Sequence, residues 1–192
     1  GALALGHLRD MGINQVANAV AQSADHIDSF LMALRTELAF YIGCVNLSQE
    51  FSRYGVPCSF PSPAPASGRL LSFSGLCDPC LALNMKQKLV GNDLDADGKN
   101  LCMITGANQG GKSTFLRGVG VAFLMMQAGI FVPAESFRGS VCTGLFTHFK
   151  REEDASMKSG KFDEELGRMS AIVDSITPDS VVLFNESFAS TN

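Results

Sequence analysis

One glycine-rich segment constrains the fold of this chain more than any other feature of its sequence. Residues 106–113 read Gly-Ala-Asn-Gln-Gly-Gly-Lys-Ser, and this spacing of glycine, lysine and serine is that of a phosphate-binding P-loop. An apolar run, residues 101–105, precedes the segment, and an amphipathic stretch follows it. We therefore expect a buried strand over 101–105, a loop, and a helix that begins at Lys112 and ends near Ala128.

The segment has the chemistry of a nucleoside triphosphate site. Its glycines let the backbone curl so that several N–H groups point at phosphate oxygens, and the positive end of the helix adds to the attraction. Lys112 can reach the β and γ phosphates, and the Ser113 hydroxyl can bind magnesium. The alternative is a glycine-rich turn without a ligand, which the strand and helix around it disfavour. The predicted contacts to the nucleoside triphosphate and Mg²⁺ are Gly106, Ala107, Asn108, Gln109, Gly110, Gly111, Lys112 and Ser113.

A second candidate lies near the end of the chain. Residues 180–184 form a continuous apolar run of strand length, which predicts a buried strand. Asn185 and Glu186 follow it, at the edge where ligands of open α/β sheets bind. Glu186 is placed to orient or deprotonate the attacking water. Asn185 stands where an aspartate usually holds the hydration shell of magnesium, and its amide oxygen can do so without adding charge. In the alternative interpretation, the pair merely ends a strand.

The pattern along the chain divides it into three parts. Apolar residues recur at helical spacing over 10–54, so residues 1–55 are expected to be a helical segment that packs on something. Four prolines mark residues 56–68 as an extended connector. Over residues 69–192, strand-length and helical runs alternate, which is an α/β pattern. In this last part we also expect a strand over 69–73, a strand pair between 139 and 149, and a helix over 163–176.

Composition limits the class of protein. Of the 192 residues, 46 % are hydrophobic and 18 % charged, which is enough apolar material for a core. The net charge of -4 gives no overall basic field that would indicate nucleic-acid binding. With no run of 18 apolar residues and no basic start of a signal peptide, we expect no membrane span and a cytoplasmic location. The six scattered cysteines are typical of a reduced cytosolic protein.

Two of the cysteines, Cys77 and Cys80, form a CxxC pair. A zinc site would need a second such pair or nearby histidines, and none follows in the sequence. A redox pair at the start of a helix stays open. The simpler interpretation is a turn whose proline lies between two part-buried thiols.

Several separated motifs resemble one family. Residues 104–117, ITGANQGGKSTFLR, are similar to the P-loop of the MutS DNA mismatch-repair ATPases, and residues 131–136, FVPAES, follow at the distance seen in that family. The resemblance covers roughly residues 70–192, and residues 10–54 resemble the end of the family's lever and core helices more weakly. The other matching segments, in order, are 78–81, 90–93, 145–147, 159–162 and 185–187.

The resemblance implies an ABC-type ATPase that works as a homodimer, with each ATP between the P-loop of one subunit and the signature segment of the other. It extends the phosphate and magnesium contacts to Thr114 and makes Glu186 the catalytic carboxylate. Ser159 and Gly160 fall where the signature loop begins, ahead of a helix whose N-terminus can face a γ-phosphate. The alternative for this pair is an ordinary helix-entry turn. DNA contacts are expected through regions outside this chain.

The chain also departs from the family pattern. Asn185 replaces an aspartate, residues 187–192 replace a glycine- and arginine-bearing sequence, and Cys77-Asp78-Pro79 lacks the histidine that usually precedes the proline. These departures favour a MutS-like subgroup, without a mismatch-reading domain in this chain, and the family's later strands and switch histidine are expected beyond its last residue. Two other functions stay open: a nucleotide-dependent switch with little turnover, and a DNA-tethering scaffold.

Overall fold

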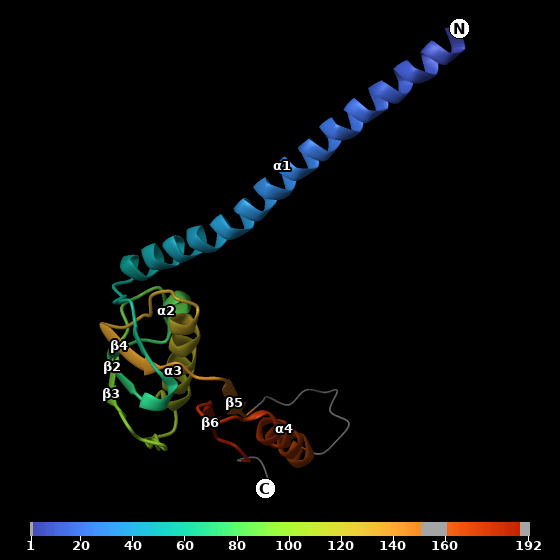
Figure 1. Ribbon diagram of the computed structural model, residues 1–192. Coiled ribbons are helices and arrows are strands. Elements are labelled where there is room, and N and C mark those ends of the chain that lie inside the picture. Colours follow the sequence, from blue (N-terminus) through green and yellow to red (C-terminus); the bar gives the residue numbers. More distant parts are fainter. Residues whose placement is uncertain (1, 151–160, 189–192) are drawn as a thin grey trace. The chain divides into compact units, whose positions relative to one another are not determined.

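The computed structural model describes residues 2–150 and 161–188 (Figure 1). Its residues divide into two compact units, Gly1–Leu47 and Ser48–Asn192. The first unit is helical, and the second combines helices with strands. The expected α/β class with a helical N-terminal segment is therefore confirmed.

The first unit is most of one long helix, α1, which spans Ala2–Arg53. The helix is uninterrupted because this stretch contains no proline. It ends just before Gly55, whose φ of +70° is the left-handed conformation that commonly follows a helix. The last turns of α1 belong to the second unit, where Phe51 is completely buried and its ring meets that of Phe131 edge-on at 6.3 Å.

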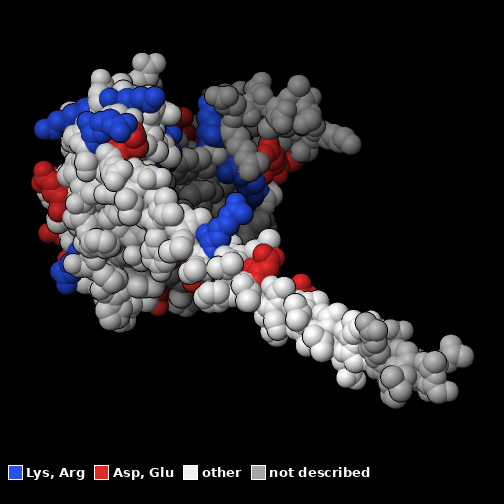
Figure 2. Space-filling view, turned by 90° about the horizontal axis from the view of Figure 1, so that it is seen from above, with Lys and Arg blue, Asp and Glu red and all other residues white. Residues whose placement is uncertain are grey.

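Within the first unit, α1 exposes many large apolar side chains, and Figure 2 shows a largely uncharged surface over the helix. By length and composition, residues 11–53 could cross a membrane, although core helices pass the same test. Asp25, Asp28, Arg35 and Glu37 interrupt this stretch, and charges of this kind are unfavourable within a bilayer. The exposed apolar side chains include Ile13, Val16, Val20, Ile27, Phe30, Leu31, Leu34, Leu38, Ile42 and Val45.

The second unit contains a four-stranded mixed sheet with the order β1-β4-β2-β3. β1 runs parallel to β4, and β2 runs antiparallel to both β4 and β3. Part of the proline-rich segment 56–68 forms β1, an edge strand, which is a position that tolerates proline. The bounds are β1 Ser62–Ala64, β2 Leu71–Leu76, β3 Asn92–Asp95 and β4 Ser136–Ser140, with a 3-10 helix over Ala66–Gly68.

Aromatic side chains hold the helix α3, Lys112–Gln127, on this sheet. The rings of Phe73 and Phe137, from β2 and β4, stack with their centroids 5.8 Å apart. Phe123 of α3 meets Phe137 edge-on at 5.9 Å. All three rings are buried, so they contribute both apolar burial and the favourable geometry of aromatic pairs. A shorter helix, α2, Pro79–Met85, lies beside α3.

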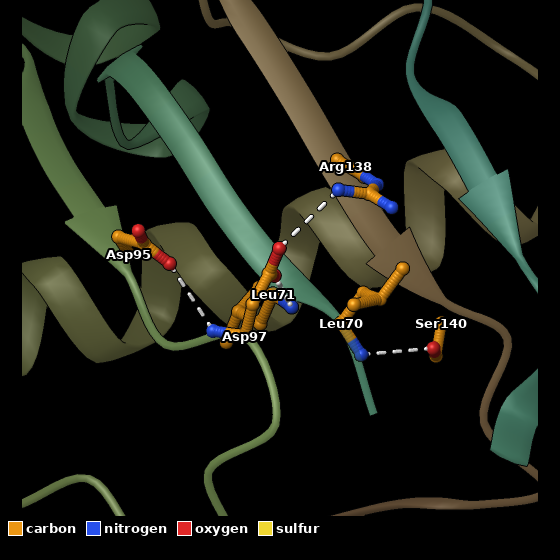
Figure 3. A network of polar contacts seen from close by, with 6 residues as sticks. All are labelled: Leu70, Leu71, Asp95, Asp97, Arg138 and Ser140. Carbon is orange, nitrogen blue, oxygen red and sulfur yellow. Dashed lines mark hydrogen bonds and ion pairs between the residues drawn. The ribbon is translucent and has the colours of Figure 1, made fainter. Parts of the chain in front are cut away.

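Polar contacts close one end of the sheet (Figure 3). Asp97, in the turn after β3, accepts a hydrogen bond from the Leu71 N–H at 2.9 Å. Its other carboxylate oxygen lies 3.3 Å from the Arg138 guanidinium of β4. The Ser140 hydroxyl accepts a hydrogen bond from the Leu70 N–H at 2.9 Å. Asp97, in the turn after β3, therefore links β2 to β4, and the bond of Ser140 to Leu70, the residue before β2, adds a second link.

A second, two-stranded parallel sheet is formed by β5, Leu145–Phe149, and β6, Val181–Asn185. The helix α4, Lys161–Ser175, lies between the two strands in the sequence. On α3, a Cβ atom at Gly120 would lie 2.8 Å from Leu183 of β6. The absence of a side chain at Gly120 therefore lets α3 approach β6 closely.

Two expectations about strands are wrong. Residues 101–105 have no regular secondary structure, and Leu101 and Met103 are each 79 % exposed. An apolar run becomes a stable strand when neighbouring strands pair with it, and no strand in the described part of the chain pairs with this one. Between 139 and 149, β4 and β5 belong to different sheets and do not form the expected pair. The helices α3 and α4 lie where the sequence predicted them.

Candidate functional site

The loop over residues 106–111 turns back on itself immediately before α3. Gly111 is the N-cap of α3 with φ of +86°, a conformation that costs a residue with a side chain about 1–2 kcal/mol. Gln109 also lies in the left-handed region, with φ of +63°. The Gly110 N–H donates to the Ala107 carbonyl at 3.1 Å. The loop is therefore tightly curled, and the N-terminus of α3 opens directly from it.

Lys112 folds back over this loop. Its ammonium nitrogen Nζ donates to the carbonyl oxygens of Gly106, at 2.9 Å, and of Ala107, at 2.7 Å. A compact positive charge is therefore held over the loop, where phosphate groups bound to the loop would meet it. Asn108 is exposed on the loop, and Thr114 is half-buried in the first turn of α3.

The loop meets the end of β6 through Ser113. The Ser113 hydroxyl donates to the side-chain oxygen Oδ1 of Asn185 at 3.0 Å, across 72 residues of sequence. Asn185 is the last residue of β6 and is half-buried. Glu186 follows it, is exposed, and has φ of +51°. The structure therefore brings together Ser113 and Asn185 from the two predicted motifs, and Glu186 is the next residue in the chain after Asn185.

A cavity of about 770 Å³ opens beside this contact, which is within the size range of small-molecule sites. Lys112 and Phe115 of α3 line it, as do residues 181–185 of β6 and Glu186 directly after it. Arg69 and Lys99 add positive charge elsewhere in its lining. The cavity therefore has mainly apolar walls, with Lys112 and the polar end of β6 at one side. This combination suits an anionic ligand that also has an apolar part.

An ion pair that the sequence analysis did not single out fixes α3 behind the loop. The Asp78 carboxylate caps α2 by accepting from the N–H groups of Cys80, at 2.8 Å, and Leu81, at 3.3 Å. The same carboxylate accepts from Arg117 Nε on α3 at 2.6 Å and from its terminal nitrogen. Hydrogen bonding to Asp78 raises the pKa of Arg117. Asp78 therefore ties α2 to the helix that carries Lys112.

Sequence reasoning also missed a buried histidine behind Glu186. His148 is completely buried on β5, and its ring nitrogens lie near Ser187 and Glu165. The sequence did contain a signal for it. Side chains alternate between the two faces of a strand, so His148 points to the same face of β5 as Phe146.

The other predicted residues are the Ser159-Gly160 pair and the two cysteines of the CxxC segment. Ser159 and Gly160 lie outside the described residues. Cys77 is buried and Cys80 is exposed, and both are free thiols. Burial is the main cause that raises the pKa of Cys77, and the negative charge of Glu135 adds to it. In residues 2–150 and 161–188, no group of three or more His, Cys, Asp or Glu side chains could hold a metal ion.

Two family descriptions match this chain. "MutS2 N-terminal domain" matches residues 1–54, and "MutS domain V" matches residues 102–191. The second match contains the loop, Asn185 and Glu186. Three proteins named DNA mismatch repair protein MutS are also similar to it. The protein of Chloroflexus aurantiacus is 28 % identical over 164 residues, which are 84 % of this chain and 17 % of that protein.

The other two relatives give higher identity over shorter alignments. The protein of Methanothrix thermoacetophila is 32 % identical over 151 residues, or 78 % of this chain and 18 % of that protein. The protein of Porphyromonas gingivalis is 39 % identical over 99 residues, or 50 % of this chain and 11 % of that protein. These matches support membership of the MutS family. Domain V is the ATPase domain of that family, and the chain spans less than a fifth of the length of the relatives it matches.

Proposed function

We propose that this chain is the ATP-binding and ATP-hydrolysing part of a cytoplasmic MutS-like protein of DNA mismatch repair or DNA processing. In this proposal the second unit is an ABC-type P-loop domain of a homodimer, and each nucleotide lies between the P-loop of one subunit and the signature segment of the other. The contact of 3.0 Å between Ser113 and Asn185 carries the proposal, because a magnesium-dependent nucleotide site needs the loop beside the polar end of a strand. DNA is bound by regions outside this chain.

The described residues fit ATP with Mg²⁺. The Ser113 hydroxyl and the Asn185 amide oxygen are ligands of the type that magnesium prefers, and magnesium commonly keeps several of its waters. Ser113 would bind the ion directly, and Asn185 would accept from one of its waters. Lys112, with the backbone N–H groups of residues 106–114, would hold the phosphates. The bound ion would neutralise phosphate charge, although the uncharged Asn185 would hold it less tightly than an aspartate.

Glu186 has the role of catalytic carboxylate in this proposal. It is exposed directly after β6, where a carboxylate can orient and deprotonate an attacking water. Lys112 and the loop N–H groups stabilise the charge on the transferred phosphoryl group. Ser159 and Gly160 are proposed to complete the site from the partner subunit.

The test measures ATP binding and turnover by the full-length protein. We expect Glu186→Gln to lower kcat by about 100-fold or more while ATP still binds. Lys112→Ala is expected to weaken ATP binding by about 10- to 100-fold, since it removes a charge-assisted contact. Glu50→Gln is the control, because this carboxylate pairs with Arg53 on α1. Turnover by Glu186→Gln equal to that of Glu50→Gln would contradict the assigned role of Glu186.

A nucleotide-dependent switch with little turnover is the second candidate, and Asn185 is the observation that favours it. An uncharged residue at this position weakens the hold on magnesium without preventing nucleotide binding. Comparing turnover of the full-length protein with that of Asn185→Asp separates the two candidates. A large gain in turnover supports the switch, whereas no change supports an ATPase that is already competent with asparagine.

A scaffold that tethers DNA and uses nucleotide for assembly is a further alternative. Such a scaffold predicts DNA binding by the full-length protein that depends on ATP and weakens steeply as the salt concentration rises. DNA binding that is independent of ATP would count against it.

A further inference from the structure

The chain that follows β6 has an unusual backbone conformation. Glu186 has φ of +51° and Phe188 has φ of +61°, so two residues with side chains lie in the left-handed region. A residue with a side chain adopts this conformation at an energetic cost, because its Cβ atom crowds the backbone carbonyl oxygen. Strained backbone of this type persists when surrounding contacts over-determine it, so the contacts of this turn should be identifiable.

Ser187 supplies the first of these contacts. Its hydroxyl lies 2.7 Å from Nδ1 of His148 and 3.0 Å from the backbone carbonyl oxygen of the same residue. The hydroxyl donates to this carbonyl oxygen, and the same oxygen atom of Ser187 lies within hydrogen-bond distance of the His148 ring. The residue directly after Glu186 is in this way fixed to β5, the strand that pairs with β6.

Glu165 of α4 supplies the second contact. Its carboxylate oxygen Oε2 accepts a hydrogen bond from the Phe188 N–H at 2.6 Å, and its backbone carbonyl lies 3.2 Å from Nε2 of His148. Because a carbonyl oxygen can only accept, Nε2 carries the hydrogen of this bond. His148 is completely buried and Glu165 is 4 % exposed. Burial of this kind strengthens the bonds and makes their loss costly.

The same short segment meets the loop on its other side. Asn185 is paired with Phe149 in the sheet and accepts from Ser113 at the start of α3. The backbone of Glu186 is therefore held from both ends. Asn185 joins it to the P-loop, and Ser187 and Phe188 join it to the buried pair of His148 and Glu165. Neither member of this pair belongs to the proposed nucleotide-binding residues.

We propose that His148, Glu165 and Ser187 are positioning residues, which hold the strained turn and thereby aim the carboxylate of Glu186. This inference rests on the proposed function, since it concerns the residue that the proposal makes catalytic. Its consequence is that loss of the contacts lowers turnover without lowering nucleotide affinity, because the P-loop contacts are left in place. A misplacement of about 1 Å in a catalytic group can reduce the rate by about 100-fold.

The decisive variant is Ser187→Ala in the full-length protein, matched to Ser180→Ala. Both changes remove one hydroxyl beside β6, but Ser180 lies at the opposite end of the strand, near Thr177. We expect Ser187→Ala to lower kcat by about 10-fold or more and to change the Kd for ATP by less than twofold. Ser180→Ala should leave both values unchanged, and Ser187→Thr, which keeps the hydroxyl, should restore kcat.

A second measurement reads the turn without relying on turnover. Hydrogen–deuterium exchange of the full-length protein should show faster exchange over residues 185–188 in Ser187→Ala and in Glu165→Ala than in Ser180→Ala. Glu165→Gln keeps an oxygen acceptor for the Phe188 N–H and should stay close to the unmodified protein. Exchange and kcat in Ser187→Ala that match those of Ser180→Ala would overturn the inference.

The two failures are distinguishable. If Glu186→Gln abolishes turnover but Ser187→Ala does not lower it, the inference is overturned and the proposed function stands. If Glu186→Gln leaves turnover unchanged, the proposed catalytic role of Glu186 is lost and the aiming role falls with it. The exchange measurement then still decides whether the buried pair holds the turn.

Discussion

Asp78 offers the sharpest test of how the helix that follows the loop is held in place. Its side chain is 1 % exposed. The carboxylate caps α2 through the N–H groups of Cys80 and Leu81, and it bonds Arg117 on α3. Asp78→Ala removes the cap and the ion pair in one change, whereas Asp78→Asn keeps an acceptor for the cap and removes the charge.

The expected magnitudes follow from these contacts. Loss of an N-cap costs about 1 kcal/mol. A hydrogen bond to a charged group contributes about 1.5–3 kcal/mol, but the Arg117 side chain is 46 % exposed, so solvent screening reduces the ion pair to about 1 kcal/mol. We therefore expect Asp78→Ala to lower the free energy of unfolding by about 2 kcal/mol and Asp78→Asn by about 1 kcal/mol. Arg117→Ala should cost about 1–2 kcal/mol, because it removes the charged partner of a buried carboxylate that keeps its two N–H donors.

The assay is urea denaturation at pH 7, followed by circular dichroism. Arg138→Ala is the matched control, because Arg138 pairs with Asp97 at 3.3 Å and the two side chains are 54 % and 30 % exposed. An ion pair with this exposure should contribute less than about 0.5 kcal/mol. If Asp78→Ala were no more destabilising than Arg138→Ala, the reasoning from burial and capping would be refuted.

Three further outcomes are expected. Iodoacetamide at pH 8 should modify exposed Cys80 much faster than Cys77, since burial raises the pKa of Cys77 and disfavours its thiolate; equal rates by mass spectrometry would contradict this. Because the folded-state pKa of Cys77 is raised, its neutral thiol stabilises the fold fully at pH values below the ordinary thiol pKa of about 8.5. This stabilisation is lost as the pH rises through the folded-state pKa of Cys77. Phe51→Ala, at a site that is 0 % exposed against Phe131, should lower the free energy of unfolding by about 3–5 kcal/mol, and a loss below 1 kcal/mol in urea denaturation would show that the site is not packed. Gly111→Ala, at φ of +86°, should cost about 1–2 kcal/mol and weaken ATP binding by the full-length protein, and an unchanged Kd would contradict the loop geometry.

The helices show how far local sequence signals reach. The predicted helix over 112–128 is observed as Lys112–Gln127, and that over 163–176 as Lys161–Ser175. The first prediction rests on the amphipathic stretch after the loop. The second rests on two acidic residues in the first turn and on Pro178 after the end of the helix. The strand expected over 101–105 failed because strand formation depends on a partner that no local pattern supplies.

The sequence by itself determined the local features of the candidate site. The glycines that let the loop curl, the lysine and serine that follow them, and the apolar run that carries Asn185 and Glu186 all lie within short segments. Their chemistry is readable because each segment constrains its own backbone.

Tertiary structure alone decided which of these groups meet. Ser113 contacts Asn185 across 72 residues, and Asp78 contacts Arg117 across 39. The buried His148 contacts Ser187 across another 39. Contacts at such separations are set by how α3, β5 and β6 pack on one another, and a close approach like that of Gly120 to Leu183 depends on the shape of both elements at once.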